Sequence, residues 1–139
     1  MAFSIGDVFE KHVYFSREDV LGFARLVEDT NPMHRDEAFA RSTRFGGLIA
    51  SGAQPVAYLM AFCADSTTNG MQGVGLEFTF RFKGAVKPDA WVTLRWRIVA
   101  SEPKPKLGGD IVTLEGAVLA EDGTPLVEAH GAVLSTRDL

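Results

Sequence analysis

Residues 53–64 are apolar at nearly every position, and this stretch constrains the fold more than any other. Its Pro55 is compatible with a helix only in the first turn, so a helix should begin close to Gly52. A helix that is apolar on all sides is normally buried, and this run is much too short to cross a bilayer. We therefore expect a central helix that other elements surround.

The second half of the chain supplies those elements as strands. Apolar and polar residues alternate with period two in residues 76–83 and 92–98, the pattern of half-buried strands. Asp122-Gly123 is a strong hairpin signal between two further strands, at 111–120 and 126–134. With a first strand near 7–15, the pattern predicts an α+β fold in which an antiparallel sheet wraps around the central helix. We assign residues 1–139 to one domain, since no repeat or linker interrupts them.

A shorter helical region precedes the central helix. Ser16 with Asp19 resembles a capping box, and Val20, Ala24 and Val27 follow at the spacing of one buried helical face. The pair Asn31-Pro32 ends this helix, because proline disfavours helical geometry at the residue before it. Residues 35–41 are expected to form a second short helix, with Ala38 and Phe39 pointing inward.

The turn after the first helix carries an acid and an imidazole. Asp29 and His34 lie five positions apart across the Asn31-Pro32 turn, so both side chains can point into one cleft. Carboxylate and imidazole groups are the common general acids and bases near neutral pH. Asn31 is expected to bond to the backbone of the turn, and Asp36 to cap the second helix.

Composition excludes several classes of function. The 139-residue chain has a formal charge of −4, which argues against nucleic acid or an anionic membrane as its partner. The single Cys63 excludes an internal disulfide, and its helical spacing indicates a packed core thiol. His12 and His130 lack ligand-like spacing, so no metal is expected. The first residues lack the pattern of a secretory signal, and we expect a cytoplasmic protein.

Two segments together resemble a known family. They are Asp29-x-Asn31-Pro32-x-His34-x-Asp36 and the run from Phe45-Gly46-Gly47 through Leu48-Ile49-Ala50-Ser51-Gly52. The chain resembles, over nearly its whole length, the MaoC-like or (R)-specific enoyl-CoA hydratase branch of the hot-dog fold. The resemblance implies reversible hydration of a trans-2-enoyl thioester to an (R)-3-hydroxyacyl thioester. It implies Asp29 and His34 as the catalytic dyad and the Gly52 amide as a donor to the thioester oxygen.

The required chemistry agrees with this assignment. Adding water to an enoyl thioester needs a base for the water, an acid for the α-carbon and a donor for the enolate-like oxygen. An amide at a helix N-terminus meets the third need, assisted by the helix dipole. One departure from the family is Ser51, which stands where many members have histidine. We expect Asn31 and Ser51 to support the dyad.

Two alternatives of other classes remain open. A hot-dog acyl-CoA thioesterase would hydrolyse the thioester and release a thiol, and a non-catalytic subunit would bind the acyl thioester without turnover. The hydratase and thioesterase readings take a coenzyme A thioester as substrate, and no cofactor is expected in any of the three. Long strand edges left bare are a liability, so a homodimer or a higher homo-oligomer is expected. The sequence does not distinguish acyl chain length, coenzyme A from acyl-carrier protein, or the physiological direction.

Overall fold

The structure is a computed structural model that describes residues 4–68 and 72–137. Its strands are β1 (Val8–Phe15), β2 (Gln72–Phe82), β3 (Ala90–Lys104), β4 (Gly109–Leu119) and β5 (Pro125–Thr136). Its helices are α1 (Arg17–Leu26), α2 (Glu37–Arg41) and α3 (Ala53–Thr68), with 3-10 turns at Pro32–His34 and Pro105–Leu107.

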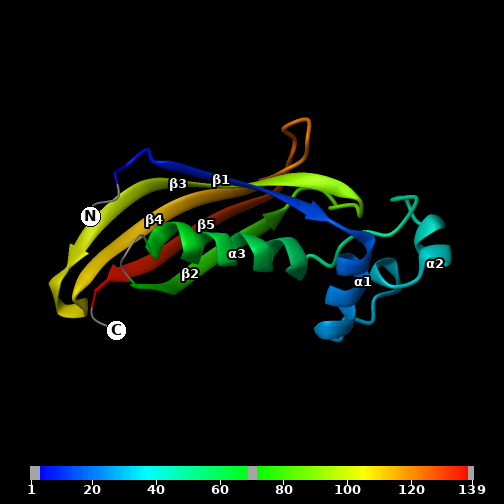
Figure 1. The fold of residues 1–139 in the computed structure, drawn as a ribbon, viewed down its shortest axis with the longest axis horizontal. Coiled ribbons are helices and arrows are strands. Elements are labelled where there is room, and N and C mark those ends of the chain that lie inside the picture. Colours follow the sequence, from blue (N-terminus) through cyan, green and yellow to red (C-terminus); the bar gives the residue numbers. More distant parts are fainter. Residues whose placement is uncertain (1–3, 69–71, 138–139) are drawn as a thin grey trace.

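The strands form one antiparallel sheet in the order β1-β3-β4-β5-β2, so β1 and β2 are its edges. Figure 1 shows this sheet curving along one side of α3, as the sequence predicts. The predicted hairpin turn between β4 and β5 is also confirmed. Gly123 has a φ of 87° there, and its amide donates to the Ala120 carbonyl at 2.9 Å.

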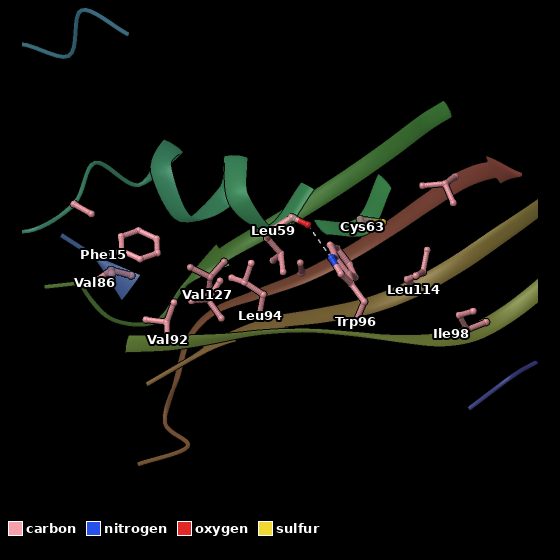
Figure 2. Packing of buried hydrophobic residues seen from close by; sticks show 14 of the residues in the cluster. Phe15, Leu59, Cys63, Val86, Val92, Leu94, Trp96, Ile98, Leu114 and Val127 are labelled. Carbon is pink, nitrogen blue, oxygen red and sulfur yellow. Dashed lines mark hydrogen bonds between the residues drawn. The ribbon is translucent and has the colours of Figure 1, made fainter. Parts of the chain in front are cut away.

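The core lies between α3 and the sheet. Trp96 of β3 is fully buried, and its indole N–H donates to the Leu59 carbonyl of α3 at 2.8 Å (Figure 2). Gly116 of β4 lies beneath this indole, where a Cβ atom would stand 2.5 Å from the ring. The absence of a side chain at Gly116 therefore makes room for the largest buried side chain of the core.

The composition of the central helix predicts burial on all sides, but the structure buries only part of its surface. Leu59 and Cys63 face the sheet and are buried, whereas Met60, about 100° around the helix from Leu59, is 40% exposed. The sheet covers only one side of α3, which explains the difference. On the edge strand β2, Phe78 and Phe80 pack against the core, but Phe82 is 59% exposed. Phe82 therefore lies outside the core.

The predicted caps of both short helices are confirmed, whereas the predicted buried faces of both helices are partly wrong. Ser16 accepts from the Asp19 amide at 3.0 Å, and the buried face of α1 comprises Val20 and Ala24. Val27 lies beyond the end of α1 and is exposed. Asp36 caps α2 by accepting from the Phe39 amide at 3.1 Å.

The inward positions predicted for Ala38 and Phe39 are wrong. Both side chains are exposed, and Ala40 is the buried residue of α2. The reason is that α2 begins only at Glu37, after the 3-10 turn, which changes the face that meets the core.

The fold brings Asp29, His34 and Ser51 together at one end of the sheet. Figure 1 shows α1 and α2 at this end, beside the start of α3 and the loop between β2 and β3. Within residues 4–68 and 72–137, no helix has both the length and the apolar character needed to span a membrane.

Candidate active site

A tight turn after α1 fixes the Asp29 carboxylate. The Glu28 backbone is left-handed, with a φ of 57°, and the Asp29 amide donates back to the Ala24 carbonyl at 2.8 Å. Asp29 Oδ1 then accepts from the Asn31 amide at 3.0 Å, while Asn31 Oδ1 accepts from the Met33 amide at 3.2 Å. The predicted structural role of Asn31 is confirmed, and these bonds hold both residues in place.

His34 is clamped against the segment that leads into α3. Its Nδ1 lies 2.8 Å from the Ile49 carbonyl, and the Ile49 amide donates to the Met33 carbonyl at 3.2 Å. A carbonyl oxygen can only accept a hydrogen bond, so Nδ1 must carry the proton. In the neutral imidazole, Nε2 is then left as the proton acceptor.

Asp29 and His34 meet as the sequence predicts, and Ser51 joins them. His34 Nε2 lies 3.8 Å from Asp29 Oδ2, and the Ser51 hydroxyl donates to that same oxygen at 2.8 Å. The His34 and Ser51 side chains are buried, whereas that of Asp29 is 28% exposed. The pair therefore presents two proton acceptors at a partly open surface.

Hydrogen bonds keep Asp29 ionised. Its pKa is lowered chiefly by the Asn31 amide and then by the Ser51 hydroxyl, while the charges of His34 and Arg35 act in the same direction. Partial desolvation opposes this shift but is the smaller effect against the two hydrogen bonds. A carboxylate that accepts two hydrogen bonds is stabilised in its charged form.

Gly52 and His34 line one concavity, which we call the His34 pocket. It has a volume of about 340 Å³, and its walls include His34, Phe45, Gly52, Phe82, Val86 and Val127. Gly52 immediately precedes α3, where backbone N–H groups lack intrahelical acceptors and the helix dipole favours negative charge. The Phe82 ring lies over Gly52, 3.1 Å from where a Cβ atom would stand.

Other reactive groups are not part of this arrangement. Burial raises the pKa of the Cys63 thiol to about 12, so it remains protonated at neutral pH. Residues 4–68 and 72–137 contain no cluster of histidine, cysteine and acidic side chains suited to a metal. His12 and His130 are both exposed on the strands, away from His34.

The structure identifies contacts that sequence patterns do not specify, including the partner of Ser51, which the sequence places only as a supporting residue. The hydrogen bond from Ser51 to Asp29 joins residues 22 positions apart, and Phe82 reaches Gly52 from the far end of β2. Phe78, Phe80 and Phe82 alternate along β2, and this row of phenylalanines is the signal in the sequence for an apolar pocket wall.

Comparison with known proteins gives a consistent result. The family model described as "MaoC like domain" matches residues 5–116. The chain is 28% identical over 138 residues to a 3-hydroxybutyryl-CoA dehydratase of Methylorubrum extorquens, covering 90% of this chain and 86% of that protein.

Solved structures show the same hot-dog fold. The (R)-hydratase of A. caviae superposes with a TM-score of 0.85 at 25% identity, with 96% of this chain and 97% of that one covered. The R-hydratase PhaJ1 of Pseudomonas aeruginosa gives a TM-score of 0.86 at 24% identity, with 98% and 84% covered.

Proposed function

Because the chain belongs to the MaoC-like domain family, we propose that it hydrates a trans-2-enoyl-CoA reversibly to an (R)-3-hydroxyacyl-CoA. The observation that carries this proposal is the pairing of His34 Nε2 with Asp29 Oδ2 at 3.8 Å, beside the pocket that Gly52 lines. Both atoms are proton acceptors in the state that the hydrogen bonds favour. A water molecule with an oxygen about 2.8 Å from each atom can donate one hydrogen to each.

The proposed reaction accounts for each proton and bond without assigning the proton transfer to Asp29 or to His34 alone. The thioester oxygen accepts from the Gly52 amide at the start of α3, which stabilises negative charge on that oxygen. One member of the dyad removes a proton from the water while the water oxygen bonds to the β-carbon of the enoyl group. The π electrons move toward the carbonyl, and the same proton is then delivered to the α-carbon. The reverse sequence removes water.

Ser51 and Asn31 have supporting roles in this scheme. They hold the two oxygens of Asp29, with Ser51 on Oδ2 and the Asn31 backbone amide on Oδ1. The apolar walls of the His34 pocket, including Phe82 and Val127, are suited to an acyl chain.

The test is hydration of crotonyl-CoA, followed by loss of the conjugated thioester absorbance and by the chirality of the product. We expect Asp29→Asn and His34→Ala each to lower kcat by about 10²–10⁴-fold, the usual loss for a general acid or base. Asp36→Asn is the matched control, because asparagine also caps helices and Asp36 serves as the α2 cap. Undiminished rates in both dyad variants would contradict the proposal. Release of a thiol would instead indicate a thioesterase.

We further propose that the active form is a homodimer or larger homo-oligomer. The edge strand β2 carries exposed apolar side chains at Val74, Leu76 and Phe82, and Met60 of α3 is exposed as well. Exposed apolar edge strands favour pairing with another chain. A second copy of this chain offers the same edge for pairing.

A further inference from the structure

A second concavity lies beside the His34 pocket. It has a volume of about 350 Å³ and is lined by α2, the turn after it and the loop between β2 and β3. We call it the Arg41 pocket. Phe45 lines both pockets, and the loop between β2 and β3 continues from Val86 in the first to Lys87 in the second. Figure 1 shows α2 and this loop at the same end of the sheet.

The Arg41 pocket contains two cations, Arg41 and Lys87, that form no ion pair within the part of the chain that the structure describes, although the charge of Arg41 helps to lower the pKa of Glu37. Of its charged lining residues, Arg17 and Glu37 bind each other, with Arg17 Nε donating to Glu37 Oε1 at 2.7 Å. Asp89 accepts from the Tyr14 hydroxyl at 3.2 Å and from the Arg17 amide at 3.3 Å.

Arg41 and Lys87 form no ion pair with any residue in the described ranges 4–68 and 72–137. Although the chain has a net charge of −4, this pocket has positive charge available for an anion.

The pocket also has room along the wall that it shares with the His34 pocket. Gly46 and Gly47 follow Phe45 in the lining, and a Cβ atom at either glycine would meet nothing within 4 Å. A flexible ligand can therefore pass over this turn from one pocket to the other. Its reactive end would lie at His34, and its anionic end at Arg41 and Lys87.

We propose that Arg41 and Lys87 bind phosphate of the phosphopantetheine arm that carries the thioester substrate. This inference rests on the proposed function. Coenzyme A and acyl-carrier protein both present such an arm, and guanidinium and ammonium groups are the usual partners of phosphate. The two cations position the arm, and the dyad at Asp29 and His34 carries out the reaction.

The test compares charge reversal at this pocket with charge reversal elsewhere. Arg41→Glu and Lys87→Glu are matched with Arg44→Glu and Lys106→Glu, which reverse the same charges at exposed residues outside the pocket lining. Two substrates are used: crotonyl-CoA, and the crotonyl thioester of N-acetylcysteamine, which keeps the thioester but has no phosphate. Thermal unfolding of each variant checks that the fold is intact.

We expect each pocket variant to raise KM for crotonyl-CoA by about fivefold to tenfold, with kcat changed less than twofold. Hydration of the N-acetylcysteamine thioester should be unchanged, and both control variants should resemble wild type with both substrates. An equal loss with the two substrates, or no loss with crotonyl-CoA, would overturn the inference.

A third substrate, crotonyl-acyl-carrier protein, distinguishes the sources of phosphate. A similar KM effect with both carriers assigns the pocket to the phosphate of the phosphopantetheine arm. An effect with crotonyl-CoA alone overturns that assignment and points to the nucleotide phosphates.

Calorimetric titration with coenzyme A itself separates this inference from the proposed reaction. Weaker binding by the Arg41→Glu/Lys87→Glu double variant supports the phosphate site even if wild type hydrates none of the thioesters. Equal dissociation constants, or no binding by wild type, would overturn it.

Discussion

Ser51 helps to lower the pKa of Asp29 through one hydrogen bond, and the loss of that bond should be measurable at the Asp29 carboxyl group. The Ser51 hydroxyl is the second largest cause that lowers the pKa of Asp29. Ser51→Ala should therefore raise that pKa toward the usual aspartate value and lower the hydration rate. The measurement is a carbon-13 NMR titration of the Asp29 carboxyl, which Asp29→Asn identifies by the loss of its signal.

The same variant has a stability signature with a definite sign. Because the folded pKa of Asp29 is lowered, its ionised form stabilises the fold above the unfolded pKa, and this contribution is lost as pH falls through the folded pKa. The stability difference between wild type and Ser51→Ala should therefore be larger at neutral pH than in acid. Ser51→Thr keeps a hydroxyl and is the control. An unchanged carboxyl titration in Ser51→Ala would show that the hydroxyl does not hold Asp29.

Gln54 is a buried polar residue, and we expect its amide group to lower the free energy of unfolding of the protein. It is fully buried in the first turn of α3, and neither its amide nitrogen nor its amide oxygen has a partner among the described residues. Desolvating such a group without a hydrogen bond costs about 1–3 kcal/mol. Gln54→Leu, of similar shape, should raise the thermal midpoint by several degrees in calorimetry. A lowered midpoint would mean that the amide has a stabilising partner in solution.

At the scale of residues, the sequence predicts the dyad and its supporting residues Asn31 and Ser51, but not which atoms these residues contact. Asp29 and His34 are recognisable because the turn at Asn31-Pro32 brings nearby positions together, which is local chemistry. The contact from Ser51 to Asp29 and the cover of Phe82 over Gly52 depend on how α3 and β2 pack. Spacing along the chain carries little information about such tertiary contacts.

At the scale of elements, the position of the Trp96 ring of β3 depends on Gly116, its partner on the neighbouring strand β4. A Cβ atom at Gly116 would stand 2.5 Å from the buried Trp96 ring, which also holds α3 through the Leu59 carbonyl. Gly116→Ala should therefore lower the free energy of unfolding by about 1–3 kcal/mol, the usual effect of overpacking. Chemical denaturation measures this, with Trp96 fluorescence as one probe.

Gly22 is the matched control for this substitution. It lies in α1, and a Cβ atom there meets nothing within 4 Å. Gly22→Ala should stabilise the protein by about 0.5–1 kcal/mol, because alanine favours the helix. Equal effects of the two substitutions would show that the indole does not limit space at Gly116.

The caps and turns of the elements are predictable, and their buried faces are less so. Ser16, Asp36 and the turn at Gly123 follow from local backbone preferences, and all three are confirmed. Phe39 points outward because the 3-10 turn delays the start of α2. A short helix gives too few residues for periodicity to identify its inner face.

At the scale of the whole molecule, the edge strand β2 is a surface suited to self-association. Its Leu76 side chain is 49% exposed, and Val74 on the same strand is exposed too. An edge strand presents unpaired backbone groups, so a second sheet can extend it with backbone hydrogen bonds. Apolar side chains along that edge would then become buried.

Leu76→Arg should therefore convert the proposed homodimer to monomers, because it places a charge at the centre of a contact that must exclude water. Leu107→Arg is a closely matched control, since Leu107 is also 49% exposed but lies in the 3-10 turn between β3 and β4. Sedimentation equilibrium measures the mass of wild type and both variants. We expect wild type and Leu107→Arg to sediment alike, and Leu76→Arg to approach the monomer mass of 15.1 kDa. A wild type that is monomeric at all concentrations would remove the basis for the dimer. A Leu76→Arg variant that stays associated would place the interface on another surface.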